Sequence, residues 1–236
     1  MKLDAILWDY DGTLVNSVPK NMAITKSILE IVAPHLTGDN LPLYLQTEAL
    51  YHQANHSAKN WQELYLEYYG LTHDEMLLAG SMWAEQQLNN QTPVMLFDGI
   101  KQVVTQFSQL PHGICSQNAQ HNIRSILSKN GIHNQFKAVV GYDDVPSQYQ
   151  KPHPMGGMKC LEAIYGHKQR QQLIYIGDHE ADTQFARSLQ LALGDQAQVI
   201  SIAAAYSGSQ PQDWTHQPDH IAYGVEDLVP IINQYL

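Results

Sequence analysis

Cysteine is scarce in this sequence. The 236 residues include only two cysteines, Cys115 and Cys160, and their spacing matches neither a metal-binding motif nor a disulfide framework. This composition argues against a disulfide-rich secreted domain. We therefore expect a protein of a reducing compartment, the cytoplasm.

Basic residues and long hydrophobic runs are also few. Lys and Arg number 13 against 23 Asp and Glu, which gives a formal net charge of -10. A chain this acidic is poorly suited to nucleic acid or to an anionic membrane surface. No apolar run approaches the ~20 residues of a membrane span, and Asp4 and Asp9 interrupt the apolar segment that a signal peptide requires. We expect neither a nucleic-acid nor a membrane partner.

The sequence does contain a short strand pattern that ends in two acids. The apolar run at residues 5–8 is followed by Asp9 and Asp11, and then by Gly12 and Thr13. This pattern predicts a buried strand that leads into a tight turn. Two carboxylates so close repel each other unless a cation lies between them or one holds a proton. Because open α/β sheets bind ligands at their strand ends, the pair is a candidate site, although solvated turns use the same residue types.

The rest of the chain shows two kinds of pattern. Residues 17–90 carry amphipathic helical stripes, one of them over 41–54, and a capping box of Thr72 and Glu75 opens the last. Strand and helix patterns then alternate up to a final helix over 225–235, which predicts a parallel sheet covered on both faces. We therefore predict an α/β fold: a Rossmann-like parallel core of residues 1–15 and 93–236, with an inserted all-helical domain of residues 16–92.

Further strand patterns end in polar residues. Ser116 and Gln117 follow the strand expected at 113–115, and Asp178 follows the one at 173–176. Because parallel strands end at one edge of their sheet, these residues should meet Asp9 and Asp11 there. Each of them alone also has an ordinary explanation as a helix cap, a helix-dipole acid or a surface group.

The order of these residues resembles the haloacid dehalogenase-like (HAD) hydrolase superfamily. The family's first motif, DxDGT, matches residues 9–13, and its second, a strand-end Ser or Thr with Asn nearby, matches Ser116 and Asn118. Its third, a Lys followed by Pro, matches Lys151, and its fourth, GDxxxD, matches residues 177–182. The helical insertion is similar to the cap domain of the phosphoglycolate phosphatase-like branch, a layout shared by β-phosphoglucomutase-like proteins.

The resemblance implies a phosphatase that hydrolyses a small phosphorylated metabolite through an aspartyl-phosphate. Asp9 would be the nucleophile, and Asp11 the general acid and base. Ser116, Gln117 and Lys151 would bind the phosphate. Dehalogenases of the superfamily lack an acid at the position of Asp11, so its presence favours phosphoryl chemistry.

The resemblance also implies a bound Mg²⁺. Its ligands would be the side chains of Asp9 and Asp178 and the main-chain carbonyl of Asp11, with waters. Asp182 would orient a water on the metal, and Thr13 would support the ligands without touching the reacting atoms.

The sequence leaves the substrate and the fate of the phosphoryl group open. Between residues 16 and 92 the only cationic side chains are Lys20, Lys26 and Lys59, and there is no Arg. Because a substrate carboxylate usually meets an Arg, this mildly disfavours phosphoglycolate and favours a neutral polyol or sugar phosphate. A phosphomutase and a non-catalytic phosphate-sensing module are alternatives. The chain would be a monomer or a homodimer.

Overall fold

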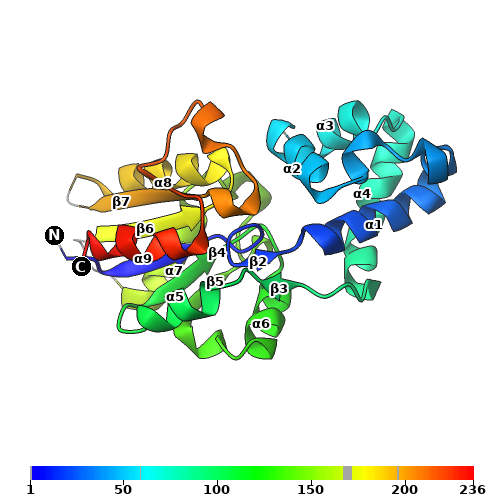
Figure 1. Cartoon of the computed structure of the whole chain (residues 1–236). Helices are drawn as coiled ribbons and strands as arrows, with labels where there is room; N and C mark the ends of the chain where they lie inside the picture. Colours follow the sequence, from blue (N-terminus) through cyan, green and yellow to red (C-terminus); the bar gives the residue numbers. More distant parts are fainter. Residues whose placement is uncertain (1, 59, 167–171, 196) are drawn as a thin grey trace. The chain divides into compact units, whose positions relative to one another are not determined.

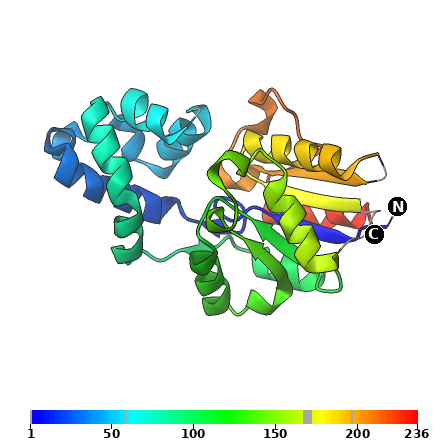
Figure 2. The same cartoon turned by 180° about the vertical axis from the view of Figure 1, so that it is seen from behind.

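The computed structural model of the protein describes residues 2–58, 60–166, 172–195 and 197–236, so Lys59 lies outside the described residues. The chain divides into two compact units, one of Met1–Asn16 with Met95–Leu236 and one of Ser17–Val94 (Figures 1 and 2). Within the described residues, no helix combines the length and the apolar character needed to span a bilayer.

The first unit is built on a six-stranded sheet in which every neighbouring pair is parallel. Its strands, in spatial order, are β5 (Phe136–Val140), β4 (His112–Cys115), β1 (Ala5–Trp8), β6 (Gln172–Gly177), β7 (Gln198–Ala204) and β8 (His220–Ala222). β1 lies between β4 and β6, which suits a strand whose four residues are all buried. All carboxyl ends therefore point to one edge, and the predicted α/β fold with a parallel core is confirmed.

Helices cover both faces of this sheet. Helices α7 (Met155–Tyr165) and α8 (Glu180–Leu193) pack on the face that carries Leu7 and Tyr175. Helices α5 (Ile100–Gln106) and α9 (Leu228–Asn233) lie in front of the sheet in Figure 1, whereas α7 lies in front of it in Figure 2. Helix α6 (Gln120–Lys129) follows β4. Both faces of the central strands are therefore shielded from water, as their apolar sequences require.

The second unit is all-helical. Its main helices are α1 (Val18–Val32), α2 (Glu48–Ser57), α3 (Trp61–Glu63) with a π-helical continuation over Leu64–Tyr68, and α4 (His73–Asn89). Three short 3₁₀ turns, Pro34–Leu36, Gly38–Asn40 and Leu43–Leu45, link α1 to α2. The capping box predicted for α4 is confirmed, because the Thr72 side chain accepts from the Glu75 N–H and the Glu75 carboxylate accepts from the Thr72 N–H.

Two predicted helices are shorter than expected. The helix expected over 41–54 begins only at Glu48, because Thr47 is extended and its hydroxyl caps α2 by accepting from the Leu50 N–H at 3.2 Å. The helix expected over 225–235 is a 3₁₀ turn over Val225–Asp227 followed by α9. The structure also contains an antiparallel pair that the sequence pattern does not predict, β2 (Val15–Asn16) and β3 (Met95–Leu96), because each strand is too short to show a period.

Candidate active site

The turn after β1 carries the two acids of the first motif. The Asp9 N–H donates to the Ile176 carbonyl at 2.8 Å, which extends the pairing of β1 with β6 to the first acid. The chain then turns at Gly12, whose φ of +72° is unfavourable for residues with a Cβ. Asp9 is buried and Asp11 is half-buried. The turn thus places two carboxylates at the end of the central strand.

Asp11 is held by an asparagine from the next strand end. The Asn118 side-chain amide donates to Asp11 Oδ2 at 2.9 Å. The amide oxygen of Asn118 accepts from the Ala119 N–H at 2.8 Å, so its NH₂ group must face Asp11. The Asn118 N–H in turn donates to the Ser116 hydroxyl at 3.1 Å, which joins the second motif to the first.

Lys151 lies at the centre of the site. Its ammonium donates to Asp9 Oδ1, to Asp182 Oδ1 at 2.7 Å and to the Tyr175 hydroxyl at 3.0 Å. The side chains of Lys151, Asp9 and Asp182 are each less than a tenth exposed. Little solvent therefore reaches the ion pairs. Charges interact more strongly in such a buried site than they do in water.

Two glycines allow the fourth-motif acids to approach. A Cβ on Gly12 would overlap the Asp178 carboxylate, and a Cβ on Gly177 would overlap the Asp182 side chain. Carboxylate oxygens of Asp9, Asp178 and Asp182 consequently lie within 4.8 Å of one another. Asp182 also accepts from the His179 N–H at 3.1 Å, through the oxygen that does not face Lys151.

Burial dominates the electrostatics of this cluster. Burial raises the pKa of Asp9 to about 7 against the attraction of Lys151, and neighbouring Asp182 raises it further. Burial also raises the pKa of Asp178 well above its usual value, together with the negative charges of Asp9 and Asp182. Burial by itself would lower the pKa of Lys151, but Asp182 and Asp9 hold it above its ordinary value. One ammonium is thus too little charge for the acids around it.

The donor set fits a hard divalent cation. Three carboxylates offer oxygen ligands at short range, the ligand type that Mg²⁺ selects. A cation among them would also offset the repulsion that raises the pKa values of Asp9 and Asp178. Asp182 has both oxygens engaged, by Lys151 and Tyr175 on one and by the His179 N–H on the other. A metal bound directly by Asp182 would therefore compete with these hydrogen bonds.

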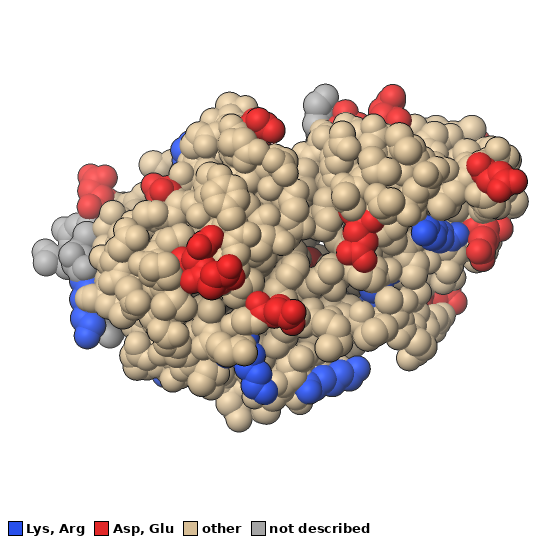
Figure 3. Space-filling model, viewed as in Figure 1, with Lys and Arg blue, Asp and Glu red and all other residues tan. Residues whose placement is uncertain are grey.

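The residues predicted to bind phosphate line one pocket. Ser116, Gln117 and Lys151 share it with Tyr142 and Tyr149, all within the first unit. Ser116 is buried, whereas the Gln117 side chain is exposed. Over the face shown in Figure 3, the described Lys and Arg side chains stand apart from one another and form no basic patch.

Thr13 follows the two acids in the same turn. It is fully buried, and its hydroxyl oxygen has no hydrogen-bond partner among the described residues. Its carbonyl accepts from the Tyr206 hydroxyl at 2.8 Å, which ties the turn after Asp11 to the segment after β7. The structure thus brings Thr13 next to the predicted site through its main chain.

Sequence reasoning missed three contributors to this site. The sequence pattern places Asn118 in the second motif without indicating its contact with Asp11, and it predicts no role for Tyr175 or Tyr206. Tyr175 does leave a signal, because it is the only polar-tipped residue in the otherwise aliphatic run at 173–176. A hydroxyl in a buried strand needs a hydrogen-bond partner, and here its partners are Lys151 and Asp182.

Comparison with known proteins agrees with this arrangement. A model of the haloacid dehalogenase-like hydrolase family matches residues 6–193. The chain belongs to this family. It is 22% identical over 249 residues to the pyrophosphatase PpaX of Listeria innocua, covering 98% of this chain and 97% of that one. It is 24% identical over 204 residues to a phosphoglycolate phosphatase of Cereibacter sphaeroides, covering 81% and 84% of the two chains.

Solved structures of the family share the whole fold. A candidate phosphoglycolate phosphatase of Lactobacillus plantarum superimposes with a TM-score of 0.73 at 19% identity, over 98% of this chain and 100% of that one. A haloacid dehalogenase-like family protein of Streptococcus pneumoniae has a TM-score of 0.68 at 18% identity, over 97% and 98% of the chains. The protein is therefore a hydrolase of this family with an α/β core and a helical cap, and its named relatives are phosphatases.

Proposed function

We propose that this protein is a Mg²⁺-dependent phosphatase that hydrolyses a small phosphate monoester through a phosphorylated Asp9. The observation that supports it best is the convergence of Asp9, Asp178 and Lys151 at one strand edge, beside the pocket that contains Ser116. A carboxylate nucleophile repels an anionic phosphate, so it needs adjacent positive charge. Lys151 supplies one positive charge, and the carboxylates around it offer a binding site for a cation that would supply more.

The first chemical step uses Asp9 and Asp11. One Asp9 oxygen forms a bond to phosphorus while the bond from phosphorus to the leaving oxygen breaks. Asp11, protonated at this stage and positioned by Asn118, gives its proton to the leaving oxygen. The Ser116 hydroxyl donates a hydrogen bond to a phosphoryl oxygen, and the Lys151 ammonium supplies positive charge beside the phosphoryl group and the Asp9 carboxylate.

The second step returns the enzyme to its starting state. Asp11 takes a proton from a water whose oxygen bonds to phosphorus, and the bond between phosphorus and Asp9 breaks. Inorganic phosphate leaves, and Asp11 is protonated again.

Mg²⁺ would be held by the side chains of Asp9 and Asp178 and by the main-chain carbonyl of Asp11. Bound there, it would supply positive charge that offsets the charge of the phosphoryl group. Asp182 accepts a hydrogen bond from Lys151 and would orient a water on the metal rather than bind the metal itself.

The substrate we propose has a neutral remainder, such as a polyol or a sugar. The named relatives act on pyrophosphate or phosphoglycolate, both of which carry further negative charge. This chain has no Arg between residues 16 and 92 to meet such a charge. A panel of phosphate esters tests this: neutral esters should give the higher kcat/KM, and a preference for phosphoglycolate or pyrophosphate would refute the substrate class.

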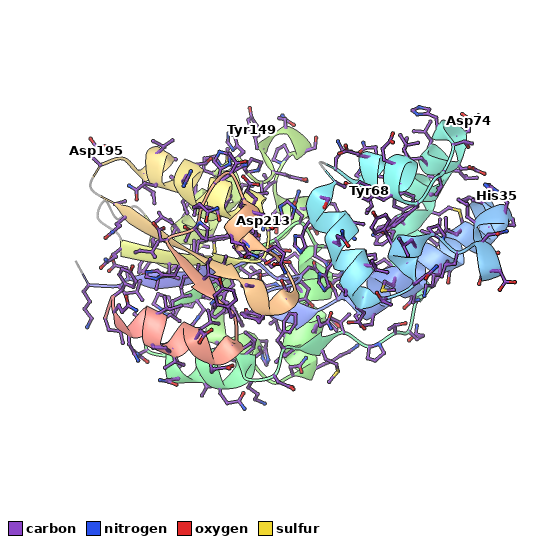
Figure 4. The ribbon with its side chains drawn as sticks, turned by 45° about the horizontal axis from the view of Figure 1, so that its top comes forward. His35, Tyr68, Asp74, Tyr149, Asp195 and Asp213 are labelled. Atoms are coloured by element: carbon purple, nitrogen blue, oxygen red, sulfur yellow. The ribbon has the colours of Figure 1, made fainter. Side chains whose placement is uncertain are left out.

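The activity itself is tested with p-nitrophenyl phosphate. Wild-type protein should release inorganic phosphate with Mg²⁺ and not with EDTA, and Asp9→Asn should lower kcat by about a thousandfold or more, the scale of losing a nucleophile. Asp195→Asn is the matched control, because Asp195 is exposed and lies away from the loop that carries Tyr149 (Figure 4). Full activity of Asp9→Asn would refute the nucleophile, and activity unaffected by EDTA would refute the metal.

A further inference from the structure

The Lys151 ammonium has three N–H donors, and the described residues provide three acceptors for them. Two are the carboxylates of Asp9 and Asp182, and the third is the Tyr175 hydroxyl at 3.0 Å. The two carboxylates lie on the segments that carry the nucleophile and the fourth motif. Tyr175 is the only one of the three acceptors whose position does not itself depend on ionic charge.

Tyr175 is rigidly placed. It lies within β6, is 1% exposed, and its ring packs against Phe185 of α8 with ring centroids 4.7 Å apart. The ammonium lies 5.7 Å from the centre of the Tyr175 ring and 6.0 Å from that of Phe185. The two rings therefore form cation–π contacts with the charged end of Lys151.

The Tyr175 hydroxyl also joins the surrounding segments. While it accepts from Lys151, its own proton can go to Asp182 Oδ1 at 3.1 Å or to the Cys115 carbonyl at 3.3 Å. Cys115 is the last residue of β4, directly before Ser116. One hydroxyl thus contacts the lysine, an acid of the fourth motif and the strand end that leads to the phosphate-binding serine.

We propose that Tyr175 is a positioning residue that fixes the Lys151 ammonium against Asp9, so that the lysine meets the phosphoryl group in a single orientation. This inference rests on the proposed phosphatase function. With only Asp9 and Asp182 as acceptors, the ammonium could shift between the two carboxylates. The hydrogen bond to the Tyr175 hydroxyl engages its third N–H and restricts that movement. Tyr175 touches neither substrate nor metal in this account and acts only through Lys151.

The variant Tyr175→Phe isolates the hydroxyl. It keeps the ring, its packing on Phe185 and the cation–π contacts with the ammonium. It leaves one buried N–H of Lys151 without the acceptor that the hydroxyl provides. We expect kcat to fall about tenfold, the effect of one hydrogen bond to a charged group, while KM changes less than about twofold. Tyr165→Phe is the matched control, because the Tyr165 hydroxyl donates to the Asp4 carbonyl at the opposite end of the sheet; it should leave kcat unchanged.

A double variant tests whether the hydroxyl acts through the lysine. In a Lys151→Met background, adding Tyr175→Phe should lower kcat no further, because the ammonium that it positions is gone. A merely structural role would lower kcat by the same factor in both backgrounds and would overturn the proposal. An unchanged kcat in the single variant Tyr175→Phe would overturn it as well.

A second readout does not depend on activity. A buried, fully hydrogen-bonded ammonium exchanges its protons slowly with water, so wild-type protein should show a resolved lysine ammonium signal by ¹⁵N NMR that Lys151→Met lacks. Tyr175→Phe should shift or broaden this signal, and Tyr165→Phe should not. An unaltered signal in Tyr175→Phe would refute the positioning role. If the signal responds as expected but wild-type protein hydrolyses no phosphate ester, the proposed function fails and the positioning of Lys151 stands.

Discussion

His112 is a buried histidine that the fold requires in its neutral form. It is fully buried in β4, where its Nδ1 accepts from the Trp8 indole N–H at 3.0 Å. Its Nε2 lies 3.1 Å from the Phe107 carbonyl, so the tautomer that satisfies both contacts carries its proton on Nε2. Protonation of Nδ1 would set two N–H groups against each other, directly beside the strand that delivers Asp9.

The cost of that proton follows from the pKa of His112. Burial lowers this pKa from 6.5 to about 4, against a smaller opposing effect of the Phe107 carbonyl. The stabilisation is therefore complete above pH 6.5, the unfolded value, and is lost as the pH falls toward the folded value of about 4. Between pH 7.5 and pH 4.5 the linkage relation gives a loss on the order of 2 to 3 kcal/mol from this residue.

Urea unfolding of wild-type protein and His112→Gln measures this loss. Gln can still accept from the Trp8 indole but does not bind a proton in this pH range. Wild-type protein should therefore lose more stability than the variant between the two pH values, by roughly 2 to 3 kcal/mol. The exposed residue His121 provides the control, and His121→Gln should lose as much as wild-type protein. Equal losses in wild-type protein and His112→Gln would show that His112 does not bind its proton mainly in the unfolded state, and would refute the reasoning.

Two further substitutions test how the site is held. Gly12→Ala places a Cβ against the Asp178 carboxylate, so hydrolysis of p-nitrophenyl phosphate should need much more Mg²⁺. Gly70→Ala is the control, because Gly70 has a similar φ of +78° but no atom within 4 Å of the added Cβ. It should lose ~1 kcal/mol of stability from the same backbone strain and keep its activity. Equal Mg²⁺ requirements in both variants would contradict this. Asn118→Ala removes the donor to Asp11 and should lower kcat about tenfold, whereas Asn130→Ala at the far end of α6 should not; an unchanged kcat in Asn118→Ala would show that Asp11 needs no anchor.

The residues at the carboxyl edge of the sheet could be predicted from the sequence, because the end of a strand is visible in the local pattern. The run at 5–8 and the run at 173–176 are apolar and end in acids, and parallel topology brings such ends together. Asp9 and Asp178 therefore could be placed near each other from pattern alone. The glycines between them also carry readable information, since Gly12 is required both by its φ and by the approach of Asp178.

What the sequence could not provide was the direction of the side chains. Asp11 turns to Asn118 while Asp9 turns to Lys151, although only one residue separates the two acids. Tyr175 looked like one more buried strand residue, because hydrophobic periodicity does not register a hydroxyl at the tip of a ring. The start of α2 was predicted too early for a similar reason. The apolar pattern begins at residue 41 and continues past Thr47, but the Thr47 side chain caps the helix and fixes its start at Glu48.

The central claim is that Asp9 forms the bond to phosphorus, and trapping that bond tests it most directly. Asp11→Asn can neither protonate a leaving group nor take a proton from water, but p-nitrophenolate is a weak base and leaves as the anion without a proton. The variant should therefore form the intermediate from p-nitrophenyl phosphate with Mg²⁺ and accumulate it until an acid quench. Peptide mass mapping should find one phosphoryl group, on Asp9. A phosphoryl group on any other residue, or none although wild-type protein turns over the ester, would contradict the account.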